Sequence, residues 1–233
     1  MFLSRATLDF TSPCVNVAKG PAKVHVGNEA SPPTMTAMEP QFVLAFCIGV
    51  GLSAACGFRV FVPLLIMSIA AYSGHLTLAS GFQWIGSPVA LAAFSVATII
   101  EVAGYYVPWL DHFLDTIATP AAIIAGTIVT ASMVTGLSPF MKWTLALIAG
   151  GGAASLVQGA TVLARGVSTV STAGLANPVV ATMELGGSVA TSFLALMMPP
   201  LTILLIAVVL FFVGRKLLGS RPRKEGAEAS KMA

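Results

Sequence analysis

The sequence has very little charge. Asp, Glu, Lys and Arg make up 9% of its 233 residues, while 56% are hydrophobic; an average soluble domain carries about 25% charged residues. Between positions 41 and 214 the charged residues are only Arg59, Glu101, Asp111, Asp115, Lys142, Arg165 and Glu184. This scarcity excludes most soluble folds, because they need a polar surface. It predicts an all-α fold, a polytopic transmembrane helical bundle.

The sequence also lacks the residue patterns of most enzymes and metal proteins. It has three cysteines without metal or redox spacing and three scattered histidines. It has no nucleotide-binding glycine loop with a lysine, and no Ser, His and acid set at a recognisable spacing. We therefore expect no enzymatic activity, no cofactor, no metal site and no nucleic-acid partner.

Three parts of the chain differ in composition. Residues 1–40 contain charges, Pro and Gly but no apolar run, which excludes a signal peptide. They are either a disordered N-terminal extension or the product of a start codon placed too early, with Met35 or Met38 as the real start. Residues 41–217 form the expected integral membrane domain. Residues 218–233 form a short basic tail that we expect to be disordered.

The apolar middle divides at Pro, Gly and aromatic residues into six stretches. They lie at about 41–73, 87–107, 119–137, 140–169, 177–198 and 200–217. A helix needs about 20 apolar residues to cross a bilayer, so four stretches fit one crossing each. The first and fourth are too long, because about 33 helical residues reach about 50 Å against a hydrocarbon core of about 30 Å. Each of these two either crosses once with a tilt or a break, or forms a re-entrant hairpin.

Both long stretches carry glycines where a helix could break. Aligning them superposes Gly49 on Gly150 and Gly51 on Gly152, and the first stretch has a further glycine at Gly57. Paired interruptions of this kind are a sequence pointer to a transport site, although glycines also serve simply to pack helices closely.

The similarity extends beyond the glycines. SPVALAAF at Ser87 lines up with NPVVATME at Asn177. We infer an internal duplication, with one repeat of three segments at about 44–137 and a second at about 145–217. The alternative is that glycine-rich apolar helices resemble one another by composition.

The ends of the stretches indicate the orientation. Basic residues follow the last stretch at Arg215, Lys216, Arg221, Arg223 and Lys224. Because Lys and Arg stay with the cytoplasmic leaflet, we expect a cytoplasmic C-terminus. Six single crossings would place the N-terminus there too.

Aromatic residues gather at the ends of segments. Tyr105, Tyr106 and Trp109 follow the second stretch. Since such rings prefer the level of the lipid headgroups, we interpret them as interfacial anchors and not as ligand-binding residues.

The few ionisable residues within lipid are the candidate functional residues, because each is costly there. Glu101 and Glu184 are expected at similar depth, each on a small or polar stripe at helical spacing. A carboxylate without a cationic partner could exchange a proton during transport; the alternative is a paired group that locks helices together. Arg59, within the first stretch, needs a carboxylate, water or free carbonyl groups. Arg165 either pairs with a carboxylate or extends to the cytoplasmic interface.

Asp111 and Asp115 form an interfacial acidic pair. At i and i+4 they share one helix face and could bind a cation or hold an arginine. A short interfacial helix that exposes both to water is the alternative.

Several of these segments resemble a known family. GVGLSAACGFRVFVPLL, EVAGYYVPWLDHFLDTIATPAAIIAGT and GLANPVVATME are similar to the uncharacterised bacterial membrane-protein family catalogued as domain of unknown function 4126, over about Glu39 to Leu217. The matching positions are Gly57, Arg59, Pro63, Glu101, Pro108, Asp111, Asp115, Pro120, Asn177, Pro178 and Glu184. The resemblance implies a multi-pass membrane protein and carries no assigned activity.

We therefore expect a transporter or permease of the bacterial inner membrane, acting on a small solute or ion. Its partner would be the lipid bilayer, with a homo-oligomer left open. Its pathway would involve the two glutamates, Arg59, Arg165, the paired glycines and Asn177. The alternative is a membrane scaffold or lipid-handling protein in which the charges pair statically.

Overall fold

The fold described here is that of a computed structural model, which describes residues 40–219. The expected N-terminal extension, its start positions and most of the basic tail lie outside these residues. The described residues form helices without a β-strand, which confirms the all-α prediction. The elements are α1 (Pro40–Cys56), α2 (Phe61–Tyr72), η1 (Gln83–Gly86), α3 (Pro88–Gly104), α4 (Pro108–Met133), α5 (Pro139–Leu145), η2 (Ala146–Gly151), α6 (Gly152–Thr172), α7 (Asn177–Met197) and α8 (Pro199–Gly219).

Several helices begin where the sequence supplies a start signal. Ser87 and Ser138 cap α3 and α5 with their hydroxyl oxygens, and a proline follows each serine. Proline suits the first turn of a helix, where its missing N–H has no helical partner. These signals explain why the apolar stretches divide close to the predicted boundaries.

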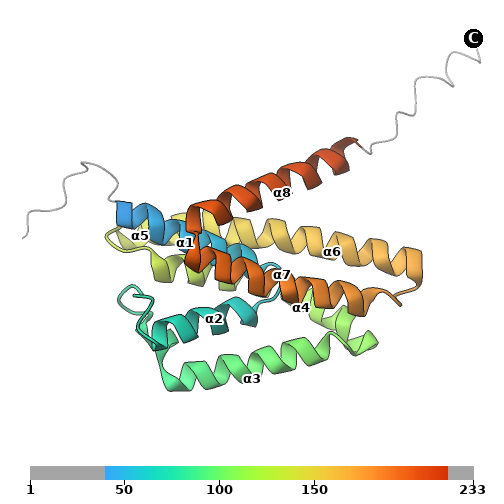
Figure 1. Cartoon of the computed structure of the whole chain (residues 1–233), viewed down its shortest axis with the longest axis horizontal. Coiled ribbons are helices and arrows are strands. Elements are labelled where there is room, and N and C mark those ends of the chain that lie inside the picture. The colour runs from blue at the N-terminus through green and yellow to red at the C-terminus, as the bar shows by residue number, and fades with distance from the viewer. Residues whose placement is uncertain (1–39, 220–233) are drawn as a thin grey trace, which may run out of the picture. The chain divides into compact units, whose positions relative to one another are not determined.

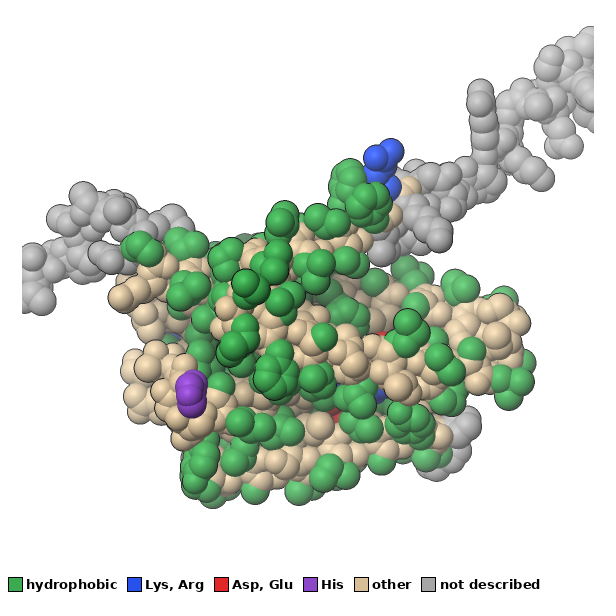
Figure 2. Space-filling model, viewed as in Figure 1, with side chains coloured by type: hydrophobic (Ala, Val, Ile, Leu, Met, Phe, Trp, Pro, Cys, Tyr) green, Lys and Arg blue, Asp and Glu red, His purple; other side chains and the backbone are tan. Residues whose placement is uncertain are grey.

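Hydrophobic side chains are spread over the face of the bundle seen in Figure 2, and few charged side chains appear on it. Val89, Ile148 and Val170 are 79%, 71% and 90% exposed. Large exposed apolar surface of this kind is rare on soluble monomers and suits contact with lipid. The segments Phe113–Met133, Pro139–Thr172 and Asn177–Met197 are long and apolar enough to cross a membrane, and four shorter apolar helices accompany them.

The first long stretch folds back on itself. Gly49 on α1 lies against Thr130 of α4, and Met67 on α2 lies 3.6 Å from the hydroxyl of Ser132 on the same helix. The start of α1 and the second half of α2 therefore lie at the same end of α4, and the two helices run in opposite directions (Figure 1). Residues 40–72 thus form a helical hairpin whose turn is inside the bundle.

The other long stretch does not turn back. Residues 139–172 form one helix through α5, η2 and α6, and η2 is a π-helical turn that contains Gly150 and Gly151. The glycine interruptions thus take two forms, a sharp break in the first stretch and a local widening of the helix in the fourth. The six predicted membrane segments correspond to the hairpin, α3, α4, the 139–172 helix, α7 and α8. The internal duplication stays a prediction.

The hairpin has a consequence for the position of the chain ends. We expect Gln41→Cys and His75→Cys to react with an impermeant maleimide from the same side of the membrane, because both exposed positions lie at the open end of the hairpin. The three native cysteines would be replaced first, and Leu175→Cys, in the turn between α6 and α7, marks the opposite side. Labelling of positions 41 and 75 from opposite sides would mean that residues 41–73 cross the membrane once.

Candidate functional site

The turn of the hairpin together with the first residue of α2, residues 57–61, is called the hinge below. It lies directly on α6: a side chain added at Gly57 would meet the carbonyl oxygen of Ala154 at 2.5 Å and Val157 at 2.6 Å. Only glycine permits this approach. Pro63 falls in the first turn of α2, where proline is tolerated. Gly57 and Pro63 together account for the place where the stretch breaks.

Glu101 of α3 holds the start of α2. Its Oε1 accepts a hydrogen bond from the backbone N–H of Val60 at 2.7 Å, and its Oε2 accepts one from Phe61 at 3.0 Å. Amide groups at the first turn of a helix have no acceptor within the helix, and inside a bilayer no water replaces it. Glu101 is itself 7% exposed, so one carboxylate from a neighbouring helix satisfies two buried amides of the hinge.

Arg59 carries a positive charge from the hinge into the bundle. Its side chain is 2% exposed. Nη2 donates to the carbonyl oxygen of Ala181 at 3.0 Å and lies 3.6 Å from Oε2 of Glu184. The guanidinium lies over the ring of Tyr105, 3.6 Å from its centre. Nε and Nη1 are buried without a hydrogen-bond partner among the described residues.

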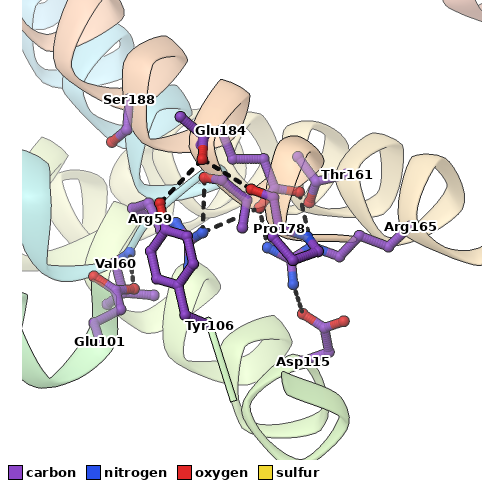
Figure 3. A network of polar contacts seen from close by, with 12 residues as sticks. Arg59, Val60, Glu101, Tyr106, Asp115, Thr161, Arg165, Pro178, Glu184 and Ser188 are labelled. Atoms are coloured by element: carbon purple, nitrogen blue, oxygen red, sulfur yellow. Dashed lines mark hydrogen bonds and ion pairs between the residues drawn. The ribbon is translucent and has the colours of Figure 1, made fainter. Parts of the chain in front are cut away.

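Arg165 of α6 is the more completely paired arginine (Figure 3). Its Nε donates to Oε1 of Glu184 at 2.9 Å and its Nη2 donates to Oε2, which makes a two-point contact with one carboxylate. Its Nη1 lies 3.3 Å from Oδ1 of Asp115 on α4. Arg165 also lies over the ring of Tyr105, 4.2 Å from the centre.

These contacts join the hinge to α3, α4, α6 and α7 in one cluster, hereafter the hinge cluster. It consists of Arg59, Glu101, Tyr105, Asp115, Arg165 and Glu184. On α4, α6 and α7 the cluster members Asp115, Arg165 and Glu184 each lie seven residues from the same end of the bundle, a depth of about 10 Å. The cluster is therefore inside the apolar bundle.

A cleft lies beside the hinge cluster. It has a volume of about 240 Å³ and is bordered by α2, α3, α4 and the hinge. Its lining is aliphatic apart from Phe61, Glu101 and Tyr105. Its rim residues Ile100 and Ile117 are 65% and 48% exposed on the apolar outer surface.

The structure brings together the four ionisable residues singled out from the sequence. Glu101 and Glu184 both lie at the hinge, and both arginines contact Glu184. Asp115 pairs with Arg165, which agrees with the expectation that it could hold an arginine. Asp111 lies in the first turn of α4, and its side chain is outside the described part of the chain.

Of the predicted glycines, Gly57 lies in the hinge, whereas the others and Asn177 lie elsewhere. Gly49 packs against α4, Gly51 against α7, and Gly150 against Gly126 of α4, so these three serve close helix contacts. Gly152 has nothing within 4 Å of the place where a side chain would begin.

Asn177, at the start of α7, bonds to Thr169 of α6. It therefore links the facing ends of α6 and α7, whereas the hinge cluster lies seven residues further along α7.

Tyr105 is the residue that sequence reasoning placed wrongly. It was expected to anchor the interface, but it is 5% exposed and lies against both arginines. A signal was present, because Tyr105 follows Glu101 by four residues on the same helix face. Its neighbour Tyr106 is 47% exposed, which fits the expected anchor.

We expect the removal of each arginine to change the free energy of unfolding by a different amount. We expect Arg165→Met to lower the free energy of unfolding by about 3–5 kcal/mol, because it leaves Glu184 and Asp115 without their main cation inside the bundle. Arg59→Met should cost less than about 1.5 kcal/mol, because Glu184 keeps both bonds from Arg165 and two unsatisfied nitrogens disappear. Unfolding of the purified variants in detergent measures both values. A larger loss for Arg59→Met would contradict this assignment.

The apolar helices and the ion cluster enclosed by them define a helical membrane protein. The family model for the domain of unknown function DUF4126 matches residues 46–218, and the chain belongs to this family. The chain itself has no match among the curated proteins or the solved structures.

Proposed function

We propose that the protein is a transporter or permease for a small solute or ion, and not an enzyme, with the hinge cluster as its binding site. The observation that carries the proposal is the helical hairpin of α1 and α2, whose turn places Arg59 among charged side chains from α3, α4, α6 and α7. A broken helix inside a membrane domain is tolerated where it lines a binding site, and its free ends can contact substrate or ions.

Polar side chains that continue from the hinge cluster support this proposal. On α7, Ser188 donates to the carbonyl oxygen of Ala55, the penultimate residue of α1. Ser192, one turn further, is fully buried, and on α6 Ser168 is buried on the other side of Arg165. The hydroxyls of Ser168 and Ser192 lack a hydrogen-bond partner among the described residues. Hydroxyls on both sides of an ion cluster suit the passage of a polar solute.

The proposal includes an orientation. Arg215 and the basic residues after it favour a cytoplasmic C-terminus in the inner membrane of a bacterium. The hinge cluster then lies nearer the cytoplasmic side, because α6 ends and α7 begins at the same end of the bundle as the last turn of α8. The start of α1 is at the other end (Figure 1).

A membrane scaffold or lipid-handling protein is the second candidate. The pairing of Arg165 with two carboxylates favours it, since such contacts can lock α4, α6 and α7 together. The aliphatic cleft at the outer surface also favours contact with a lipid chain. This candidate expects the charged residues to affect stability and no flux.

The flux experiment separates the two candidates. Proteoliposomes with the full-length protein would be tested for uptake of radiolabelled sodium, chloride, acetate and sulfate, with an internal dye reporting pH. We expect uptake of at least one ion above that of empty vesicles, and a reduction of about tenfold or more in Glu184→Gln, because this change breaks the contact with Arg165. Lys142→Gln, at a partly exposed residue of α5, is the matched control.

Glu101→Gln completes the set of variants. Uptake equal to that of empty vesicles, or unchanged uptake in both glutamate variants, would rule out the proposed mechanism. Glutamate variants that only unfold more easily, with no flux in any protein, would favour the scaffold.

A further inference from the structure

The hydrogen bonds of the hinge cluster are unevenly distributed between its acids and its bases. Each of its three carboxylates is engaged by a group of the protein. Glu101 accepts from two hinge amides, Glu184 accepts twice from Arg165, and Asp115 pairs with Arg165. The carboxylates are therefore occupied by internal donors.

The donors of the cluster are not equally occupied. A guanidinium carries five N–H groups, one on Nε and two on each terminal nitrogen. All three nitrogens of Arg165 face carboxylate oxygens. In Arg59 only Nη2 has acceptors, and the three N–H groups on Nε and Nη1 have none among the described residues.

Tyr105 does not fill this gap. Its ring lies over the flat face of the Arg59 guanidinium, whereas the N–H groups point outward in the guanidinium plane. A buried charged donor without an acceptor is among the costliest polar groups in a protein interior, and water is scarce at this depth. The unused binding capacity of the cluster thus consists of positively charged donors.

We infer that the hinge binds a small anion, such as a carboxylate or an inorganic oxyanion, through Nε and Nη1 of Arg59. This rests on the proposed function and gives the sign of the solute charge. Glu101 and Glu184, singled out in the sequence as candidate ion sites, hold the hinge and Arg165 instead. Because the Arg59 side chain is only 2% exposed, the anion would reach it only when the hinge opens.

Equilibrium binding to the purified full-length protein in detergent tests the inference. The probes are radiolabelled acetate, sulfate, phosphate and chloride, with radiolabelled sodium as the cation, all at one ionic strength. We expect saturable binding of at least one anion and none of sodium. Binding of that anion should fall about tenfold or more in Arg59→Gln and stay within about twofold in Lys142→Gln, which removes a cation far from the hinge.

Arg59→Lys keeps the inference testable if Arg59→Gln does not fold. Lysine retains the charge but lacks the planar set of N–H groups, so anion binding should still weaken. Acetate binding without sulfate or phosphate binding would assign a carboxylate, and the reverse an inorganic oxyanion. The absence of saturable anion binding, equal binding in wild type and both Arg59 variants, or saturable binding of sodium would each overturn the inference.

The outcome is separable from that of the flux experiment. Anion binding that depends on Arg59, without flux in proteoliposomes, keeps the anion site and removes transport. Flux without such binding keeps transport and removes the anion as the solute.

Discussion

The structure depends on the two hydrogen bonds between the carboxylate of Glu101 and the amides of Val60 and Phe61. The chain can reverse inside an apolar bundle only if the amides at the start of α2 find acceptors there, since lipid offers none. Glu101 provides both acceptors from a neighbouring helix. Without it, the two amides at the start of α2 would be buried without acceptors, which costs free energy for each of them.

The other contacts of the hinge cluster follow from this reversal. The hinge brings Arg59 to α7, where Glu184 lies, and Glu184 and Asp115 both pair with Arg165. The two arginines then share one aromatic ring, that of Tyr105, which directly follows α3 and lies four residues after Glu101. Such a cluster is expensive inside lipid unless its groups are paired. Its placement within an otherwise apolar bundle indicates a function at the hinge more strongly than the sequence did.

The sequence predicted the helices and their rare charged residues better than the way in which the helices pack against one another. Long apolar runs fix the helices, and rare charges within them stand out, so Arg59, Glu101, Arg165 and Glu184 could be selected without a structure. The direction of α2 could not be predicted, because it depends on an acceptor supplied from 41 positions away in the chain. Tyr105 was misread for a similar reason: whether an aromatic at a helix end faces lipid or a neighbouring arginine depends on tertiary packing.

The native cysteines of α1 allow the most direct test of the role of Glu101. Cys56 is fully buried beside the hinge, and Cys47 is partly exposed on the same helix. In Glu101→Gln one of the two hinge amides loses its acceptor, which destabilises the closed hinge by about 1–3 kcal/mol. Each ~1.4 kcal/mol makes the open hinge tenfold more populated. Single-cysteine proteins treated with a maleimide should therefore show at least about fivefold faster labelling of Cys56 in Glu101→Gln, with the labelling of Cys47 unchanged. Equal protection of Cys56 with and without the carboxylate would contradict the account.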